Sequence, residues 1–133
     1  MTGRKTIELR QESDLVLLRK TCREILIQLG FRLVAQTKLV TAASELGRNV
    51  LTHGGGGQAH FDVLERSGRR GLKMEFVDQG PGIADIRQAM TDGYTTAGGL
   101  GFGLGAAQRL ANEFIIQSTP GQGTRVTIIG WTL

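Results

Sequence analysis

Cysteine and aromatic residues are scarce in this chain, and long apolar runs are missing. The single cysteine, Cys22, excludes an internal disulfide framework and a cysteine-based zinc site. Phe, Trp and Tyr make up 5% of the residues, which leaves little material for a base-stacking surface. No apolar run approaches the roughly 18 residues that span a bilayer, and the polar start Met1–Thr6 lacks the apolar segment of a signal peptide. These absences predict a cytoplasmic protein without membrane contact.

The charge balance is mildly basic. The chain has 16 Lys and Arg against 12 Asp and Glu, which gives a net charge of +4. The excess helps an anionic ligand to approach, but the basic residues are scattered and do not indicate a nucleic-acid partner. The two histidines, His53 and His60, have no third ligand at metal-binding spacing, so we do not expect them to hold a metal ion.

Glycine is the abundant residue. The 133 residues are 40% hydrophobic and 21% charged, which predicts one folded domain over residues 1–133. Of the 20 glycines, 13 gather at Gly54–Gly57, at Gly80 and Gly82, within 98–105, and at 121–123. Glycine permits positive φ and close approach of the backbone to a ligand. The clusters therefore predict several loops around one site.

Hydrophobic patterning predicts helices and strands in separate groups. Apolar residues three and four apart indicate helices, and alternating ones indicate strands. The expected helices cover residues 15–29, 33–51, 83–90 and 103–112, the first capped by Ser13 or Asp14. The expected strands cover residues 6–9, 59–65, 72–77, 114–118 and 124–131. The order predicts an α+β two-layer sandwich with helices on one face of a mixed, mostly antiparallel sheet.

Glu45 and Asn49 form the first candidate constellation. They lie four residues apart on a predicted helix, so their side chains share one face about one turn apart. The carboxylate can take a proton or orient an attacking oxygen. The amide oxygen can ligate a hard cation such as Mg²⁺. A solvated polar pair would give the same pattern, so this motif alone leaves both interpretations open.

The second constellation, Asp78-Gln79-Gly80-Pro81-Gly82, follows the predicted strand 72–77. An Asp at a strand end before two glycines is typical of a turn. An Asp carboxylate also accepts hydrogen bonds, and the exocyclic amine of adenine is a donor. Gly80 and Gly82 would let a ring lie close to the backbone. The motif by itself is compatible with a plain turn or with a base-binding loop.

Two further glycine motifs precede a helix and a strand. Gly99–Gly105 opens a predicted helix, where backbone N–H groups can bind an anion, or it forms a hinge. It matches neither the dinucleotide fingerprint nor the P-loop. Gly121-Gln122-Gly123-Thr124 fits a hairpin turn, and the Thr124 hydroxyl could alternatively lie near a phosphate.

Taken together and in this order, the motifs resemble the boxes of the GHKL superfamily of ATPases and kinases, which includes gyrase, Hsp90, histidine kinases and MutL. The resemblance covers residues 45–124 and implies the Bergerat-type fold with ATP and Mg²⁺ as cofactors. It implies adenine binding by Asp78, metal binding by Asn49, phosphate contacts by Gly101 and Gly103, and a mobile lid over 91–98. The residues that it assigns to the nucleotide are Asn49, Asp78, Gly80, Gly82, Gly99, Gly101, Gly103, Leu104 and Thr124.

Within the superfamily, the short chain and the stretch Glu45–Gly54 are most similar to bacterial anti-sigma factors and switch-protein serine kinases of the stressosome. This resemblance implies phosphorylation of Ser or Thr on STAS-domain proteins, and activation of a PP2C-type phosphatase or another effector by the released kinase. Glu45 would accept the proton of the substrate hydroxyl or orient a water, so hydrolysis stays open beside transfer. A nucleotide-gated anti-sigma or activator module with little catalysis is the alternative, and a basic nucleic-acid adaptor is a third.

Overall fold

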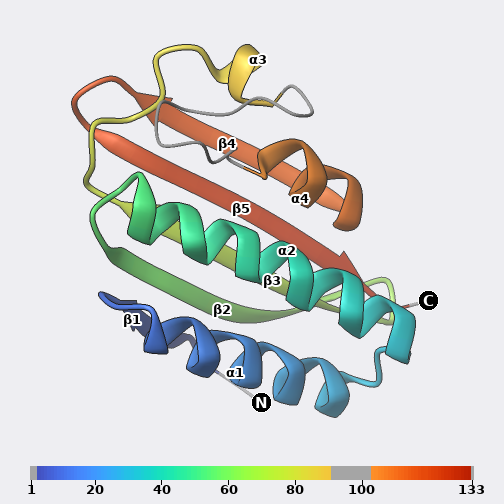
Figure 1. The fold of residues 1–133 in the computed structure, drawn as a ribbon. Coiled ribbons are helices and arrows are strands. Elements are labelled where there is room, and N and C mark those ends of the chain that lie inside the picture. Colours follow the sequence, from blue (N-terminus) through green and yellow to red (C-terminus); the bar gives the residue numbers. More distant parts are fainter. Residues whose placement is uncertain (1–2, 91–102, 133) are drawn as a thin grey trace.

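The computed structural model describes residues 3–90 and 103–132, which contain a five-stranded sheet and the helices in front of it (Figure 1). Along the chain the elements are β1 (Lys5–Leu9), α1 (Ser13–Leu29), α2 (Leu33–Thr52), β2 (Gly57–Arg66), β3 (Arg69–Asp78), α3 (Ile86–Ala89), α4 (Leu104–Leu110), β4 (Glu113–Thr119) and β5 (Gly123–Trp131).

The strands lie in the order β1-β2-β3-β5-β4, and each neighbouring pair is antiparallel. β2 with β3 and β4 with β5 are pairs of consecutive strands. The central pair of β3 with β5 joins distant parts of the chain, and Asp78 lies opposite Thr124 at one end of it. The expected α+β fold with a mostly antiparallel sheet is confirmed, and the described strands contain no parallel pair.

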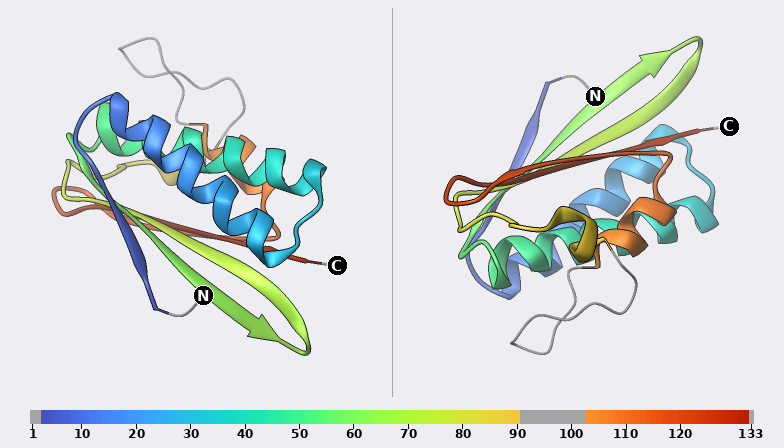
Figure 2. Two further views of the ribbon diagram at one scale, coloured as in Figure 1. Left: turned by 90° about the horizontal axis from the view of Figure 1, so that it is seen from below. Right: turned by 90° about the horizontal axis from the view of Figure 1, so that it is seen from above.

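Helices α1, α2 and α4 lie on one face of the sheet (Figure 2). The core fills the space between the two layers, as expected for a sheet whose strands alternate between buried and exposed side chains. In β3, Leu72, Met74 and Phe76 are at most 1% exposed, while Lys73 and Glu75 on the other face are partly exposed. Among the helices in the described ranges, none is long and apolar enough to cross a membrane.

The helix ends differ in detail from the expectation. Ser13 and Asp14 do not cap α1, because the helix already begins at Ser13. The Asp14 carboxylate instead accepts hydrogen bonds from the backbone N–H groups of Arg10 at 2.8 Å and Gln11 at 3.0 Å. It therefore stabilises the turn that leads into the helix. The helix expected over 83–90 is shortened to α3, whose N-cap is Asp85 through a 3.0 Å bond from the Gln88 N–H.

We expect Cys22 to be inert toward thiol reagents in the folded protein. It is fully buried in α1, with its Sγ 3.6 Å from the Met74 Sδ, and burial raises the pKa of the thiol to about 12. Because the thiolate is the reactive form, its fraction at pH 8 is on the order of 10⁻⁴. A colorimetric thiol assay should detect no cysteine before unfolding in guanidinium and one cysteine afterwards. Rapid modification under native conditions would contradict this burial.

Candidate functional site

One face of α2 forms the first wall of a pocket. Leu46, Asn49, Val50 and His53 line it at positions i, i+3, i+4 and i+7, which share one side of a helix. His53 ends the helix, and its backbone N–H donates to the Asn49 carbonyl oxygen at 2.9 Å. The amphipathic pattern that buries α2 against the sheet thus also delivers an amide and an imidazole to this pocket.

The opposite wall comes from the pair of β3 with β5. Asp78 and Thr124 form its polar end, and Phe76 with Val126, one inward-facing pair further along, are 1% and 5% exposed. The residues that line the pocket are Leu46, Asn49, Val50, His53, Phe76, Asp78, Pro81, Gly82, Ile83, Leu104, Thr124 and Val126.

The pocket has a volume of about 150 Å³. This is less than the roughly 300–1,000 Å³ of pockets that enclose drug-sized ligands, so it fits one planar ring system rather than a whole nucleotide. A small, mostly apolar pocket whose lining includes a carboxylate is suited to a heteroaromatic ring that carries a hydrogen-bond donor.

Asp78 supplies the carboxylate of this pocket and is only 9% exposed. Its Oδ1 accepts a hydrogen bond from the Gly80 N–H at 2.9 Å. Burial raises the pKa of the Asp78 carboxyl, while the backbone amides of Gly80 and Thr124 and the nearby His53 act in the opposite direction. A carboxylate has about four lone-pair positions, so two backbone amides leave acceptor capacity for a donor in the pocket.

His53 adds no charge to the pocket at neutral pH. Burial lowers the pKa of its imidazole below 6.5, and the Asp78 carboxylate only partly opposes this shift. The imidazole is therefore neutral at pH 7, and Asp78 sets the sign of the potential among the lining residues. His53 is thus both the C-cap of α2 and a residue of the pocket lining, four residues after Asn49.

Gly54 packs directly against the Asp78 side chain. A Cβ at Gly54 would overlap the Cβ and Cγ of Asp78 and lie 2.6 Å from its Oδ2. Gly80 packs on Gly54 in turn, since a Cβ at Gly80 would lie 2.7 Å from the Gly54 Cα. The sequence marked Gly54 only as part of a loop cluster, because its contact with Asp78 arises from two elements that meet in space.

The Gly54→Ala substitution should therefore displace Asp78. We expect a loss of about 1–3 kcal/mol in the free energy of unfolding, as for other overpacked sites, and an ATP affinity at least tenfold weaker. Gly55→Asn is the matched control: Gly55 has φ +74°, which Asn tolerates, and nothing lies within 4 Å of an added Cβ. Denaturant unfolding and titration calorimetry would compare the two variants, and equal ATP affinities would contradict the contact.

The segment after Asp78 is fixed to the β4–β5 turn. The Ser118 hydroxyl accepts a hydrogen bond from the Ile83 N–H at 2.8 Å. The Gly121 N–H donates to the Pro81 carbonyl oxygen at 2.7 Å. Pro81 and Ile83, which line the pocket, are thus held by hydrogen bonds of their backbone to a neighbouring hairpin.

Thr124 lies beside Asp78 in the sheet. Its hydroxyl is 2.8 Å from the Ser118 hydroxyl, in a hydrogen bond that either group can donate. One interpretation of the sequence was that this hydroxyl lies near a phosphate. The structure places it at the same end of the pocket as Asp78, the predicted adenine-binding residue, which favours a part in holding the base.

Glu45 lies one turn before Asn49 on α2 and outside the pocket lining. Its carboxylate reaches the start of α4, because a Cβ at Gly103 would lie 2.5 Å from the Glu45 Oε2. Gly103 is the N-cap of α4 with φ 64°, so glycine is favoured there by conformation and by space. Glu45 therefore occupies the junction of α2 with α4, at the edge of the pocket.

The predicted site residues that line the pocket are Asn49, Asp78, Gly82, Leu104 and Thr124. Gly80 and Gly103 lie next to its members without lining it. Gly99, Gly101 and the predicted lid over 91–98 lie outside the described residues. The remaining wall residues are mainly apolar and were not assigned to the site, because an apolar side chain facing a ligand has the same pattern as one facing the core.

The described residues contain no group of three His, Cys, Asp or Glu side chains that could hold a metal ion. Asn49, the predicted Mg²⁺ ligand, offers one neutral oxygen at the pocket. Mg²⁺ commonly binds through one or two protein oxygens together with substrate phosphates and water. The donor set therefore fits a metal that arrives with a nucleotide and does not fit a resident metal centre.

The chain matches the family described as histidine kinase-, DNA gyrase B-, and HSP90-like ATPases over residues 34–131. It is 41% identical to the serine/threonine-protein kinase RsbT of Bacillus subtilis over 131 residues, which cover 98% of each chain. It is 34% identical to an anti-sigma F factor of a Thermoanaerobacter species over 93 residues, which cover 65% of this chain and 63% of the relative.

Two solved structures share the fold. The structure of the RsbU and RsbW domains of a Mycobacterium tuberculosis protein matches with a TM-score of 0.66 at 20% identity, over 97% of this chain and 32% of that one. The catalytic domain of the histidine kinase ThkA matches with a TM-score of 0.51 at 10% identity, over 94% of both chains. At these identities the likeness concerns the fold alone.

Proposed function

Because this chain belongs to the family of histidine kinase-, DNA gyrase B- and HSP90-like ATPases, we propose that it transfers phosphate from Mg-ATP to Ser or Thr of STAS-domain partner proteins. The full-length similarity to RsbT confirms the predicted branch of the family and the predicted enzyme class, a protein serine/threonine kinase. The observation that carries the proposal is the pocket in which Asp78, Asn49 and Thr124 meet, in a chain with that similarity.

The pocket fits the base of ATP. The Asp78 carboxylate would accept a hydrogen bond from the exocyclic amine, and Phe76, Ile83 and Val126 would cover the ring. Absence of a side chain at Gly54 keeps Asp78 in place. A donor or acceptor of the base that enters the pocket and finds no partner there has lost its hydrogen bonds to water, which costs roughly 1–3 kcal/mol. The Asp78 carboxylate therefore favours adenine over bases that present an acceptor at this position.

Asn49 is the residue that would hold Mg²⁺. Its amide belongs to the pocket lining, and α2 fixes its backbone carbonyl in bonds from His53 at 2.9 Å and Gly54 at 3.1 Å. When bound, Mg-ATP supplies the transferable phosphoryl group and the metal charge that offsets developing negative charge. Gly99, Gly101 and Gly103 remain our candidates for phosphate contacts.

Glu45 is the candidate base. It lies one turn from Asn49, at the junction with α4. In this position its carboxylate would accept the proton of a substrate hydroxyl and orient that oxygen for attack. The placement outside the pocket lining supports a contact with the protein substrate rather than with the base of the nucleotide.

The partners in this proposal are STAS-domain antagonist or scaffold proteins, and a PP2C-type phosphatase or another effector that the released kinase activates. The similarity to RsbT and to an anti-sigma F factor supports a partner-switching role. In the same proposal, residues 1–133 act as one kinase domain in the cytoplasm, with neither nucleic acid nor membrane as a partner.

The test is phosphoryl transfer from labelled ATP to a STAS-domain protein of the same organism in magnesium buffer. We expect label on the STAS protein with the wild-type chain, and a loss of at least 100-fold in rate with Asn49→Ala. A STAS variant with alanine at the labelled residue is the control for site specificity. Absence of transfer from the wild type would reject the kinase proposal. A nucleotide-blind variant that still regulates its partner fully would favour the binding module.

A further inference from the structure

A second hollow lies at the far end of the helical layer, between the start of α2, the end of α4 and the end of β5. Its volume is about 340 Å³. Its lining includes Phe31, Arg32, Lys38, Leu39, Arg109 and Trp131. We call this surface the basic hollow. Residues 34–39 line the basic hollow and residues 46–53 line the nucleotide pocket. The midpoints of these two segments are 13 residues apart, which is roughly 20 Å along the helix at about 1.5 Å per residue.

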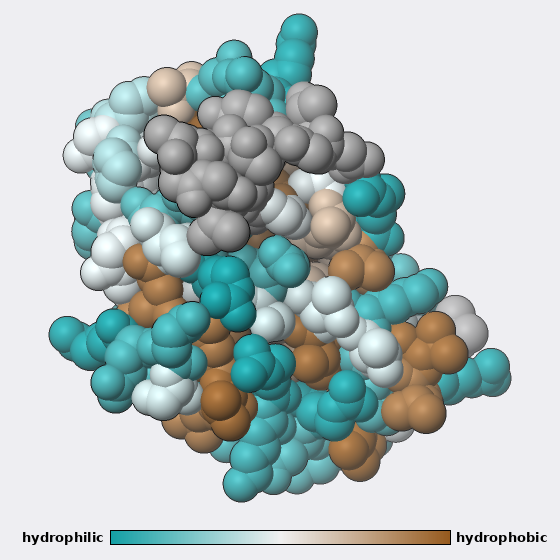
Figure 3. Space-filling view, viewed as in Figure 1, coloured by the Kyte–Doolittle hydropathy of each residue, from teal (hydrophilic) through white to brown (hydrophobic). Residues whose placement is uncertain are grey.

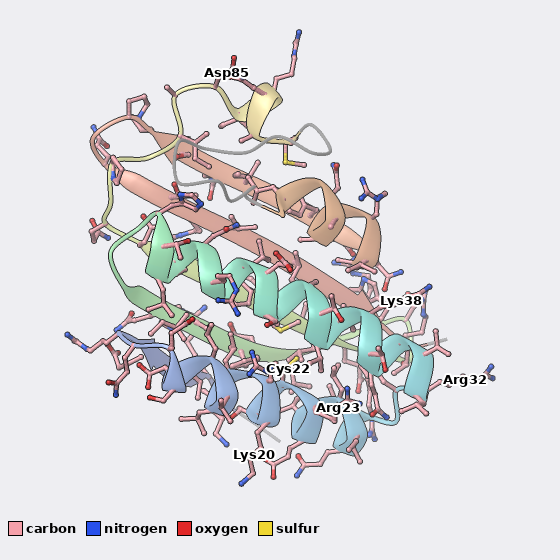
Figure 4. All side chains as sticks on the ribbon, viewed as in Figure 1. Lys20, Cys22, Arg23, Arg32, Lys38 and Asp85 are labelled. Carbon is pink, nitrogen blue, oxygen red and sulfur yellow. The ribbon has the colours of Figure 1, made fainter. Side chains whose placement is uncertain are left out.

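The charged residues in the lining of the basic hollow are all basic. Arg32, Lys38 and Arg109 belong to its lining, which contains neither Asp nor Glu. Figure 4 shows Arg32 and Lys38 at the same end of α2. Neither takes part in any of the ion pairs among the described residues. Their guanidinium and ammonium groups are thus available to carboxylates from outside.

Apolar residues make up part of the lining of the hollow. Phe31, Leu39 and Ala111 contribute to its lining. At its edge Val34 is 67% exposed and the adjacent Leu33 is 69% exposed. In Figure 3 hydrophobic residues gather over this end of α2. Large aliphatic side chains that are exposed next to one another are a feature of protein interaction sites.

Trp131 forms a rigid wall of the hollow. Its Nε1–H donates to the Glu113 Oε2 at 2.6 Å, and the Arg66 guanidinium lies 4.6 Å from the ring centroid. The ring also rests on Gly71, where a Cβ would lie 2.6 Å from its Cε3. An aromatic ring fixed in this way loses little entropy on binding, and Trp with Arg is the composition of binding hot spots.

We propose that the basic hollow docks an acidic segment of a partner protein. An apolar side chain of that segment enters the hollow, and its carboxylates pair with Arg32 and Lys38. Charge complementarity selects this occupant: a second copy of this chain would bring a net charge of +4 to a cationic rim. The inference goes beyond the proposed function, because the hollow is remote from the nucleotide and leaves room for both ligands at once.

A displayed library of random 12-residue peptides, selected on the full chain, tests the proposal. The selected peptides should carry net negative charge and at least one large apolar residue. Their affinity should fall at least tenfold on the R32E/K38E variant and should weaken with salt. Binding should shift the fluorescence of Trp131, the single tryptophan of the chain. The K5E/K20E variant is the matched control, since it changes the net charge equally at exposed positions away from the hollow.

Several results would overturn the proposal. One is a selection that yields no peptide preferring the wild type over R32E/K38E, and another is recovery of neutral or basic peptides. Sedimentation showing self-association that R32E/K38E abolishes would identify a second copy as the occupant instead. Displacement of the peptides by a single-stranded DNA 20-mer would identify a nucleic acid. ATP affinity is measured on every variant and should be unchanged, so that failure of nucleotide binding and failure of docking are separate results.

Discussion

The Asp78→Asn variant should bind ATP about 10- to 150-fold more weakly than the wild type and remain folded. A hydrogen bond to a charged acceptor contributes about 1.5–3 kcal/mol, which corresponds to this range. Asn has the same shape and keeps an oxygen for the Gly80 N–H, which donates to the Asp78 Oδ1 at 2.9 Å. Calorimetric titration with ATP in magnesium buffer gives the two affinities. Wild-type affinity in the variant would remove Asp78 from the nucleotide site.

The same variant should be at least as stable as the wild type at pH 7. Burial raises the pKa of the Asp78 carboxyl above its ordinary value of 3.8, so the folded chain holds this proton more tightly than the unfolded chain. The contribution of Asp78 to the free energy of unfolding therefore falls as pH rises from 3.8 through the raised pKa, and stays low above it. Asn does not titrate, so its contribution to the free energy of unfolding does not fall in this way as pH rises. A melting temperature well below that of the wild type would contradict the burial cost.

ATP affinity of the wild type should also fall on acidification at a pH above that of an ordinary aspartate, because protonation removes the acceptor. The Asp78→Asn variant should lack this loss. Asp85→Asn is the matched control: it removes an exposed carboxylate that caps α3, and Asn is also a good N-cap. It should retain the affinity and the pH profile of the wild type.

The Glu45→Gln variant should lower the rate of phosphoryl transfer by about 10²- to 10⁴-fold, the range found when a general base is removed. ATP affinity should change less than threefold, because Glu45 lies outside the pocket lining. Single-turnover transfer to a STAS-domain protein and calorimetric titration would separate the two effects.

Glu24→Gln, at an exposed position of α1, is the control for Glu45. It should leave both the rate of transfer and the affinity unchanged. A Glu45→Gln variant with the full rate of transfer would exclude this carboxylate as the base. An equal loss of affinity and rate would instead make Glu45 a nucleotide-binding residue.

Sequence reasoning located the elements of this fold better than the contacts between them. The alternation over 72–77 and the helical spacing of 33–51 are local patterns, and both elements are present as β3 and α2. The ends of α1 and α3 were less well predicted. A carboxylate such as Asp14 can accept hydrogen bonds from backbone N–H groups before the start of a helix or from those after it, and the sequence does not distinguish the two.

The residues of the candidate site also divide into those that a local pattern reveals and those that only contacts in space reveal. Asn49, Asp78 and Thr124 were identified because polar groups and glycines stand out in a sequence, and all three line the pocket. The contact of Gly54 with Asp78 depends on how α2 and β3 meet, which no local pattern encodes. Phe76 belongs to the wall, yet in sequence it is indistinguishable from a core residue.

The pairing of β3 with β5 has a consequence for synthesis of the chain. The β2–β3 and β4–β5 hairpins each join neighbouring stretches, whereas Asp78 and Thr124 meet only when these two halves of the sheet come together. The nucleotide site therefore contains residues from both halves of the sheet. A nascent chain on the ribosome therefore has no place for ATP until its last strand has left the exit tunnel.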